Sequence, residues 1–377
     1  MKVSAPRPIL SQWRANFSGA IGHSCAWEPG RATLGGLHSR FMAVLAPCPN
    51  LELAQRFAGC RVLVTGGAGF IGGHLCQALV AGGAEVRVLD DLSTGRIAAV
   101  PREAVLIEGD VADETTVQCA LRGCSHVFHL AALVSVPLSI EQPARCFRAN
   151  MTGTEVVLRA AVREGVGSVV HASSASVYGP KPTLPSREGD QLCCASPYAA
   201  TKAAGESLVQ AFAQAYGLRS TSLRLFNVFG PGQDPRSAYA AAISAFIDAA
   251  RNRRPATVFG DGMQTRDFVP VSDVVQAFLR AASGGAEVAG EVFNVGIGRS
   301  ITLLEVIDMI GRVAGFASPP IFAPRRAGDV EHSGADLTKI RAALGYRPTS
   351  ELEPTLAALV RAECEGACAG TARTPDA

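Results

Sequence analysis

The sequence predicts an α/β fold, in which a doubly wound parallel sheet is followed by a smaller C-terminal α/β domain. Two observations lead to this prediction. Short apolar, β-branched segments alternate with helical segments between residues 61 and 229, a pattern typical of parallel sheets built from right-handed βαβ units. Beyond residue 229 the chain changes to loops, short strands and helices rich in Arg and Pro, which indicates a second, smaller unit.

Length and composition agree with this fold and exclude several classes of protein. A chain of 377 residues with 48% hydrophobic and 18% charged residues is ordinary for a globular protein of this size. The net charge of +2 gives no reason to expect a nucleic acid partner or an anionic membrane, and no apolar run reaches the length of a membrane span. Eleven scattered Cys and seven His without ligand-like spacing predict reduced thiols in a cytoplasmic protein without a metal site.

The first 58 residues differ in composition from the rest of the chain. Up to Asn50 they contain five basic residues, many small residues and a single acid, Glu28. Such a composition is compatible with an organellar transit peptide. No sustained amphipathic helix is visible, however, so we expect residues 1–58 to be a disordered extension, or the product of a start codon upstream of a true start near Met42.

The first strand and helix are joined by a cluster of glycines. Val62–Val64 reads as a buried strand, and the pattern Gly67-x-Gly69-x-x-Gly72 follows it. Glycines at these spacings permit a tight turn, let the backbone approach a pyrophosphate, and let the helix pack closely on the strand. The N-terminus of the helix adds free N–H groups and a positive dipole end. The pattern therefore predicts a Rossmann-type, dinucleotide-binding sheet.

The second strand ends in an acid at the place where the ribose of a dinucleotide would lie. Glu85–Asp90 is that strand, and Asp90 follows the glycines by about twenty residues. Asp91 comes next, without an Arg directly after it. This favours NAD over NADP, because a 2′-phosphate would meet a carboxylate.

The remaining strands of the first domain should bring small and acidic residues to the ligand-binding edge of the sheet. Ligands bind at the carboxyl ends of such strands. Asp110 follows the third strand, where it either contacts the adenine amino group or caps its own loop. The small residues Ala131 and Ala132 follow the fourth strand and leave room for a cofactor. We expect these strands at Ala104–Glu108, Val127–Leu130, Ser168–Ala172 and Ser222–Phe226.

The second half of the chain is less regular. We expect a dinucleotide-binding domain over residues 59–230 whose sheet later segments complete, a mainly substrate-binding part over 231–355, and a C-terminal tail over 356–377 that is frayed from Cys364. The elements expected in the second half are a helix over Ala238–Asn252, strands at Thr257–Phe259 and Val292–Val295, and a helix over Leu303–Ala314.

One stretch points to a chemistry. Ser196 can cap a helix whose first turn begins with Pro, so Tyr198 and Lys202 lie four residues apart on one helical face. An ammonium near a phenol lowers its pKa, and this makes Tyr198 a base for an alcohol proton. The preceding strand runs into Ser173-Ser174, and a serine there can hydrogen-bond the reacting oxygen and order the Tyr198–Lys202 pair.

With these features the chain resembles the extended short-chain dehydrogenase/reductases, in their NAD-dependent epimerase/dehydratase branch. The resemblance covers residues 60–350 and implies an NAD-dependent enzyme for nucleotide sugars, in which Ser174 is the catalytic serine, Tyr198 the base, and Lys202 its partner on the nicotinamide ribose. The stretches that carry it are Thr65–Gly72, Asp90–Gly95, His129–Ala132, Ser173–Gly179, Tyr198 with Lys202, and Arg224–Gly230. The NAD-binding residues it implies are Gly66, Gly69, Phe70, Ile71, Gly72, Asp90, Asp91, Asp110, Val111, Leu130, Ala131, Ala132, Tyr198 and Lys202.

The residues after the catalytic serine distinguish the reactions of this family. Its dehydratases place Asp-Glu soon after their catalytic hydroxyl residue, and the UDP-glucuronate decarboxylases have a Glu in that region. Here Ala175-Ser176-Val177 follows, so no acid stands ready to assist elimination or decarboxylation. That pattern resembles a 4-epimerase. Further stretches resemble the UDP-N-acetylglucosamine 4-epimerases, namely Ser135–Ser139, Gln233–Pro235 with Tyr239, Arg266–Phe268 and Arg326–Ser333.

The resemblance also implies the residues that bind a UDP-sugar. Arg266 and Arg326 suit bidentate recognition of phosphate, and Asp329 holds the uridine ribose. Ser333 stands where epimerases restricted to non-acetylated hexoses carry a bulky Tyr, so it either leaves room for a 2-acetamido group or is simply a small surface residue. Leu138, where related epimerases often have Arg, leaves the C6 group of the sugar open. The implied substrate-binding set is Ser135, Ser174, Asn227, Gln233, Tyr239, Arg266, Arg326, Asp329 and Ser333.

The sequence therefore predicts a UDP-sugar 4-epimerase that works through a 4-keto intermediate. The expected substrate is UDP-N-acetylglucosamine with its galacto isomer, or the corresponding uronic acids. Alternatives are a decarboxylase, dehydratase or 4-reductase of the same fold, and a non-catalytic NAD-sensing protein, which would typically have lost Tyr198 or Lys202. The family's usual state is a homodimer. We expect the three histidines His129, His171 and His332 to be structural.

Overall fold

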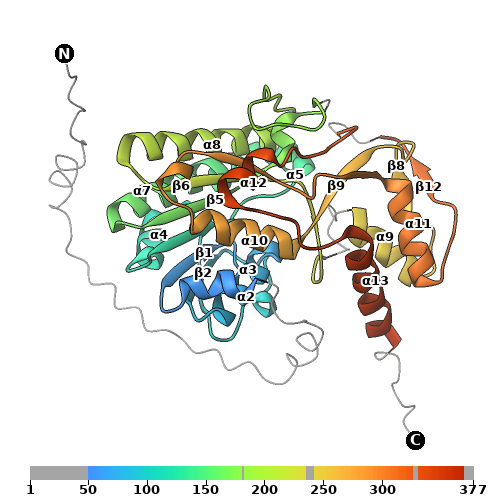
Figure 1. Cartoon of the computed structure of the whole chain (residues 1–377), viewed down its shortest axis with the longest axis horizontal. Helices are drawn as coiled ribbons and strands as arrows, with labels where there is room; N and C mark the ends of the chain where they lie inside the picture. The colour runs from blue at the N-terminus through green and yellow to red at the C-terminus, as the bar shows by residue number, and fades with distance from the viewer. Residues whose placement is uncertain (1–49, 181, 235–241, 326–329, 369–377) are drawn as a thin grey trace, which may run out of the picture.

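The computed structural model describes residues 50–180, 182–234, 242–325 and 330–368. It shows a large sheet with helices on both faces and a smaller lobe beside it (Figure 1). The sheet has seven strands in the order β10-β6-β5-β4-β1-β2-β3, all paired in parallel, which confirms the predicted doubly wound architecture. The strands are β1 (Arg61–Thr65), β2 (Glu85–Asp90), β3 (Val105–Glu108), β4 (His126–His129), β5 (Ser168–Ser174), β6 (Ser220–Leu225) and β10 (Val292–Val295).

Helices bury both faces of this sheet, which explains why successive residues of its central strands are buried without alternation. One hydrophobic core, which includes Phe57, Leu75 and Phe278, lies under α2, α3, α10 and α12. A second core, which includes Val117 and Val157, lies under α4, α7 and α8 on the other face. The helices are α2 (Leu51–Ala54), α3 (Phe70–Ala81), α4 (Glu114–Leu121), α7 (Gly153–Glu164), α8 (Pro197–Tyr216), α10 (Val271–Ala282) and α12 (Thr338–Leu344).

The smaller lobe has its own core and two small sheets. A three-stranded sheet has the order β11-β9-β7, and β12 pairs with β8. Phe229, Phe268 and Ile310 belong to the buried cluster between these strands and the helices of the lobe. Its elements are β7 (Asn227–Phe229), α9 (Ala242–Arg251), β8 (Thr257–Phe259), β9 (Thr265–Pro270), β11 (Ser300–Thr302), α11 (Leu303–Ala314), β12 (Ile321–Ala323) and α13 (Leu352–Cys368).

The chain returns from the second half to the large sheet. We expected later segments to complete this sheet without naming them, and Val292–Val295 does so as β10, which pairs with β6 at its edge. The segment Thr265–Pro270 was not predicted as a strand, yet β9 is the centre of the small sheet between β7 and β11. Strand pairing joins residues far apart in the chain, and short mixed segments carry little local signal for it.

Both expected end segments need correction within the described residues. Residues 50–58 are part of the fold, since α2 and the short helix η2 (Gln55–Phe57) place Ala54 and Phe57 in the core. The expected tail over 356–377 is wrong as far as residue 368, because α13 buries Leu356 and Val360 against α9 and α11. Residues 1–49 and 369–377 lie outside the described residues.

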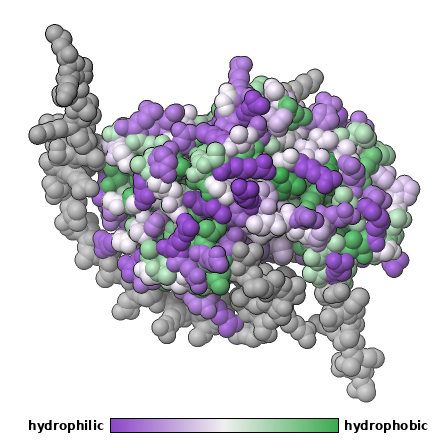
Figure 2. Space-filling model, viewed as in Figure 1, coloured by the Kyte–Doolittle hydropathy of each residue, from purple (hydrophilic) through white to green (hydrophobic). Residues whose placement is uncertain are grey.

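Hydrophilic side chains cover most of the face shown in Figure 2, and hydrophobic ones form small separate patches on it. Ile321 and Phe322 of β12 are among the exposed apolar residues, at 56% and 55% exposure. Among the described helices, none is long and apolar enough to cross a membrane. Within the same residues, no group of three or more His, Cys, Asp or Glu side chains could hold a metal ion.

The packing of α13 predicts a stability effect. Replacing the buried Leu356 with Ala leaves a cavity in the small-lobe core, so Leu356→Ala should lower the free energy of unfolding by about 2–5 kcal/mol. Arg361→Ala, on the exposed side of the same helix, should change it by less than about 0.5 kcal/mol. Chemical denaturation checks both values. Equal stability of the two variants would contradict the docking of α13.

Candidate active site

Helix α8 brings Tyr198 and Lys202 against the end of β5. The Ser196 side chain caps this helix by accepting a hydrogen bond from the N–H of Ala199 at 3.1 Å, and Pro197 occupies the first turn, as predicted. The N–H of Tyr198 donates to Oγ of Ser139 at 3.1 Å, so helix α5 (Val136–Glu141) fixes the start of α8. Tyr198 is 7% exposed and Lys202 is 5% exposed.

The three residues expected to be catalytic lie together in the structure. The Ser174 side chain is near enough to the Tyr198 phenol to lower its pKa, and Ser174 is the last residue of β5. The ammonium of Lys202 donates from Nζ to the carbonyl oxygen of Ala172 at 2.8 Å. The same Nζ is 5.9 Å from the centre of the Tyr198 ring. A hydroxyl, a phenol and an ammonium therefore converge at the carboxyl end of the sheet.

The electrostatics of this group differ from the sequence prediction in one respect. We expected Lys202 to lower the pKa of Tyr198. Burial instead raises the pKa of Tyr198 to about 12, and the Ser174 side chain only partly opposes it. Burial also lowers the pKa of Lys202 to about 8. The expectation is wrong for the protein by itself, because desolvation disfavours the charged form of both groups.

The glycine turn before α3 is closed by contacts that only glycine allows. Gly66 has a φ of +71°, and a Cβ there would lie 2.7 Å from the backbone nitrogen of Ala131. At Gly72 a Cβ would collide with the carbonyl oxygen of Gly66. Helix α3 begins at Phe70 with Gly69 as its N-cap, and no side chain caps its first N–H groups. These groups fit a pyrophosphate.

The acidic residues at the ends of β2 and β3 have partners in the protein. The two carboxylate oxygens of Asp90 accept hydrogen bonds from the N–H groups of Ala68 and Leu92, each at 2.9 Å. Asp90 therefore anchors the glycine turn at the edge where a ribose would bind. Asp110 caps its own loop through the N–H of Ala112 and pairs with Arg148 at 2.8 Å. This supports the loop-capping alternative for Asp110 and leaves its contact with adenine a prediction.

The segment after β4 contains Leu130, Ala131 and Ala132, which we expected to line the cofactor. The N–H of Ala131 donates to Oγ1 of Thr65 at 3.2 Å, so the segment is tied to the end of β1. His129 hydrogen-bonds the same Oγ1 at 2.7 Å and is fully buried, and burial lowers its pKa to about 3. His171 is also buried, with its pKa lowered for the same reason. Burial therefore favours the neutral form of both histidines, and their structural role stays a prediction.

Part of the expected sugar-nucleotide site is assembled by β9 and the segment after residue 330. Arg266 is 8% exposed and donates from Nη1 to the carbonyl oxygens of Thr265 and Glu331. Ser333 is also 8% exposed, and its N–H donates to the Thr265 carbonyl at 3.0 Å. The N–H of Glu331 donates to the carbonyl of Pro180 at 3.2 Å. Arg266 and Ser333 thus lie beside the loop that follows Ser174.

The structure shows fewer contacts for the other expected substrate-binding residues, and three of them lie outside its described part. Ser135 caps α5 through the N–H of Leu138, and Asn227 begins β7. Gln233 donates to the carbonyl of Val228 at 3.3 Å. Within the described residues, the buried side-chain oxygens of Gln233 and Ser176 are among the polar atoms without a hydrogen-bond partner in the protein. Tyr239, Arg326 and Asp329 lie outside the described residues.

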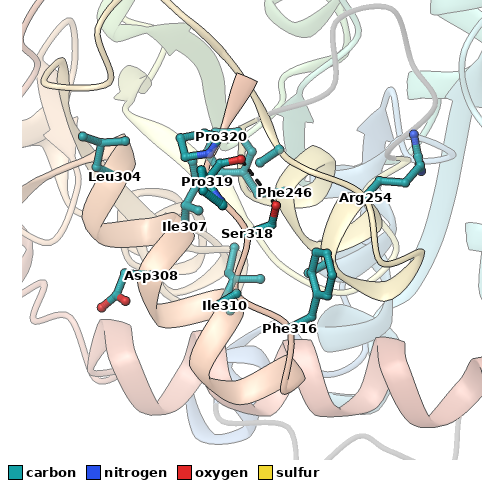
Figure 3. A pocket seen from close by; sticks show the side chains of 14 residues that line it. Phe246, Arg254, Leu304, Ile307, Asp308, Ile310, Phe316, Ser318, Pro319 and Pro320 are labelled. Atoms are coloured by element: carbon teal, nitrogen blue, oxygen red, sulfur yellow. Dashed lines mark hydrogen bonds between the residues drawn. The ribbon is translucent and has the colours of Figure 1, made fainter. Parts of the chain in front are cut away.

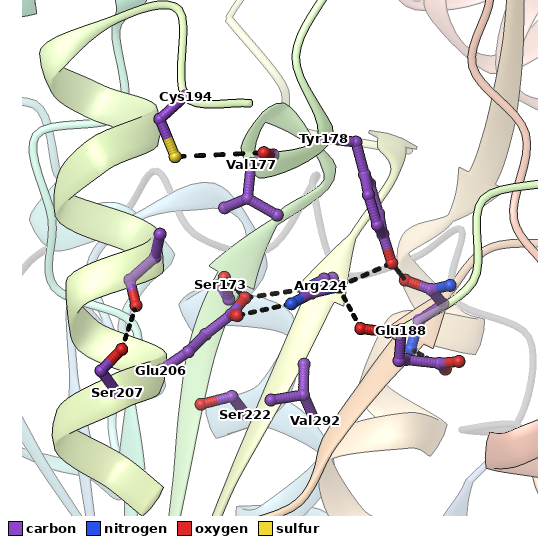
Figure 4. A network of polar contacts seen from close by, with 12 residues as sticks. Ser173, Val177, Tyr178, Glu188, Cys194, Glu206, Ser207, Ser222, Arg224 and Val292 are labelled. Atoms are coloured by element: carbon purple, nitrogen blue, oxygen red, sulfur yellow. Dashed lines mark hydrogen bonds and ion pairs between the residues drawn. The ribbon is translucent and has the colours of Figure 1, made fainter. Parts of the chain in front are cut away.

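Sequence analysis missed two polar residues behind the catalytic group. Glu206, one helical turn after Lys202, forms a buried ion pair with Arg224 of β6 at 2.8 Å (Figure 4). Asn150 accepts a hydrogen bond from the N–H of Leu133 and donates to Thr201 of α8. The spacing of Glu206 from Tyr198 and Lys202 was a usable signal, since it continues their helical face. Asn150 had none.

A cavity of about 320 Å³ lies in the smaller lobe, apart from these residues. Its lining is mostly apolar and comes from α9, α11 and the segment 316–320. Phe246, Ile307 and Phe316 are examples from these three parts (Figure 3). Arg254 and Asp308 also line it. None of the expected catalytic, cofactor or substrate residues does, so the cavity is not part of the candidate active site.

A Rossmann-type sheet that gathers Ser, Tyr and Lys at the carboxyl ends of its strands defines the class of short-chain dehydrogenase/reductases. The family model "NAD dependent epimerase/dehydratase family" matches residues 62–296. The chain belongs to this family, which confirms the resemblance and the expectation of an NAD-dependent enzyme. The glycine turn, the uncapped start of α3 and Asp90 fit that cofactor.

Named relatives and solved structures agree with this assignment. The chain is 39% identical to a UDP-glucose 4-epimerase of Mycolicibacterium smegmatis, over 80% of this chain and 97% of the relative. It matches the UDP-N-acetylglucosamine 4-epimerase of Methanobrevibacter ruminantium M1, in complex with UDP-N-acetylmuramic acid, with a TM-score of 0.78 and 33% identity, over 82% and 99% of the two chains. For the UDP-glucose 4-epimerase of Thermus thermophilus in complex with NAD, the TM-score is 0.74 and the identity 37%, over 80% of this chain and 98% of that chain. A dTDP-glucose 4,6-dehydratase of Actinoplanes sp. is 32% identical, over 80% of this chain and 96% of the relative.

The glycine contacts predict the effect of one methyl group on cofactor binding. Gly72→Ala places a Cβ against the Gly66 carbonyl and should force the turn open. We expect NAD affinity to fall by at least about tenfold, or 1.4 kcal/mol. Gly189→Ala is the control, because a Cβ at this exposed glycine meets nothing within 4 Å. Calorimetric titration with NAD measures both variants, and unchanged affinity in Gly72→Ala would contradict the placement of the pyrophosphate.

Proposed function

We propose that the chain is a UDP-sugar 4-epimerase that interconverts the gluco and galacto forms of its substrate. The observation that carries this proposal is the cluster of Ser174, Tyr198 and Lys202 at the end of β5, without an acid on the following helical turn η5 (Ala175–Tyr178). The relatives named as UDP-glucose and UDP-N-acetylglucosamine 4-epimerases support it. We further propose a homodimer in the cytoplasm, which light scattering and cell fractionation test.

Each residue of the cluster has a role in this reaction. Tyr198 takes the proton of the sugar 4-hydroxyl and later returns it, Ser174 hydrogen-bonds the same oxygen, and Lys202 holds a positive charge beside the phenolate. NAD supplies the acceptor and donor of the hydride at C4, so no reductant is consumed. Because the protein alone leaves the Tyr198 pKa at about 12, a further positive charge in the occupied site is needed to make the phenol a base near neutral pH.

The main alternative is a dehydratase, since such enzymes are among the relatives. Elimination of water needs an acid and a base near the sugar. Glu206 is a buried carboxylate near Ser174, but it already accepts hydrogen bonds from Ser173 and from two nitrogens of Arg224. This occupation favours epimerisation. Incubation with UDP-sugars and no added cofactor, followed by proton NMR, separates the alternatives, because an epimerase yields the C4 isomer without loss of water or CO₂.

We propose UDP-N-acetylglucosamine and its galacto isomer as the preferred pair. The small Ser333 supports this choice, because its backbone is held on both sides, by the Thr265 carbonyl and by the Ser300 hydroxyl. A larger side chain at this buried position would therefore have little free space. The structural neighbour named as a UDP-N-acetylglucosamine 4-epimerase is in agreement.

Removing the phenol oxygen should stop the reaction without removing the cofactor. We expect Tyr198→Phe to lower kcat by roughly 10²- to 10⁴-fold, the usual contribution of a general base. The bound NAD content of the purified protein should stay at the level of the parent. Coupled product assays and quantification of released NAD measure the two quantities. Turnover close to that of the parent would assign the base to another residue.

A larger residue in place of Ser333 should act on one class of sugar. Ser333→Tyr should lower kcat/KM for UDP-N-acetylglucosamine by at least about tenfold more than for UDP-glucose, because only the former carries the 2-acetamido group. Ser333→Ala is the matched control and should leave the ratio of the two values unchanged. An equal loss on both sugars in Ser333→Tyr would overturn the role assigned to this position.

The pKa of Lys202 predicts a loss of activity at alkaline pH. Lys202 carries its positive charge below a pKa of about 8 and loses it as the pH rises through that value. The charge favours the phenolate, so kcat/KM should fall above pH 8. Lys202→Arg retains its charge at much higher pH, and in this variant the fall should move upward by at least about one unit. A fall at an unchanged pH would exclude Lys202 as its cause.

A further inference from the structure

The catalytic helix is joined to its neighbours by a buried network of polar side chains (Figure 4). Glu206 of α8 accepts a hydrogen bond from the Ser173 hydroxyl at 2.5 Å. It also accepts from Arg224, from Nε at 2.9 Å and from Nη2 at 2.8 Å. The Arg224 and Glu206 side chains are only 4% and 6% exposed. A charge pair so well buried has to be fully hydrogen-bonded.

The far side of the network reaches the segment that carries Ser333. Arg224 donates from Nη1 to the Tyr178 hydroxyl at 2.9 Å, and Tyr178 donates to Oδ1 of Asn294 at 2.6 Å. The amide of Asn294 donates to the carbonyls of Ser186 and Asp336, at 2.8 and 3.4 Å. The network therefore joins α8, the end of β5, η5, β6, β10 and the chain just after Ser333.

From this geometry we propose that Glu206 is a positioning residue for catalysis. It holds Ser173, and thereby the backbone that carries the adjacent Ser174 hydroxyl, and it places a negative charge one helical turn from Lys202 on the same face of α8. This inference rests on the proposed function, which assigns Ser174 and Lys202 to the reaction, and it adds a residue that acts only through them.

The first part of the argument concerns the backbone of β5. Ser173 and Ser174 are consecutive residues of an extended strand, and they pair with Arg224 and Leu225 of β6. Glu206 fixes the Ser173 side chain from α8, and its partner Arg224 is the residue opposite Ser173 in the ladder. The peptide that carries Ser174 is thus held by both the ladder and the helix. Loss of the Ser173 hydroxyl would release one of these restraints.

The second part concerns charge. Lys202 and Glu206 are four residues apart on α8, so their side chains lie on the same helical face. Burial lowers the pKa of Lys202, and the Cys146 thiol and Glu206 carboxylate both oppose that shift. Replacing Glu206 with a neutral isostere should therefore make Lys202 lose its proton at lower pH. The titratable and charged groups that face Lys202 are Cys146 of α6 (Pro143–Phe147), His129 of β4, His171 of β5, and Tyr198 and Glu206 of α8.

Lysine NMR tests the charge effect without any assay of turnover. The chain has only four Lys residues, so protein labelled with ¹³C at lysine Cε gives few signals, and Lys202→Arg assigns one of them. In Glu206→Gln we expect Lys202 to titrate at lower pH than in the parent, by at least half a unit. Ser207→Ala, which removes an exposed hydroxyl from the same helix, should leave the titration unchanged. An unmoved Lys202 in Glu206→Gln would overturn the charge role.

Kinetics test the positioning effect. Ser173→Ala keeps both charges and removes one hydrogen bond, so it should lower kcat at least fivefold, with KM and NAD content within twofold of the parent. If the role of Ser173 is merely structural, Ser173→Ala lowers the melting temperature while its kcat per folded molecule equals that of Ser207→Ala. This result would overturn the proposal. If Glu206→Gln does not fold, Glu206→Asp, which keeps the charge but shortens the reach to Ser173, should match Ser173→Ala. A parent protein inactive on every UDP-sugar would refute the proposed function, and the Lys202 titration would still decide the charge role.

Discussion

The arrangement of the active site depends on the close packing of α8 on β5. Gly205 makes this possible, because a Cβ there would lie 2.8 Å from the ring of His171. With the helix this near, Lys202 reaches the Ala172 carbonyl and Glu206 reaches Ser173. These polar groups face the strand rather than solvent, and each has to find a partner there, since an unpaired buried polar group costs several kcal/mol. The contact is therefore both the support of the site and its main constraint.

The same burial determines the chemistry that the site can perform. It moves the pKa of Tyr198 up and that of Lys202 down, so the protein alone holds a protonated phenol near a weakly basic amine. This disfavours proton abstraction while the site lacks its cofactor.

The smaller lobe is tied to the sheet by buried polar contacts rather than by sequence continuity. Asp267 of β9 is fully buried and accepts hydrogen bonds from the N–H groups of Ile297, Gly298 and Ala335. These contacts hold the chain after β10 and the segment after Ser333 against β9, which also carries Arg266. Residues proposed to contact the sugar nucleotide thus come from distant parts of the chain and meet at one strand.

The sequence by itself determined the local features of this protein. The glycines between β1 and α3, the apolar strands and the Ser196 cap are signals within a few residues, and each lies where it was predicted. Tertiary structure alone decided the pairing of β10 with β6, the central place of β9, the docking of α13 and the sign of the pKa shift at Tyr198. The physical reason is common to all four. Strand partners, buried faces and desolvation depend on what the rest of the chain places around a residue, and residues nearby in sequence do not encode that environment.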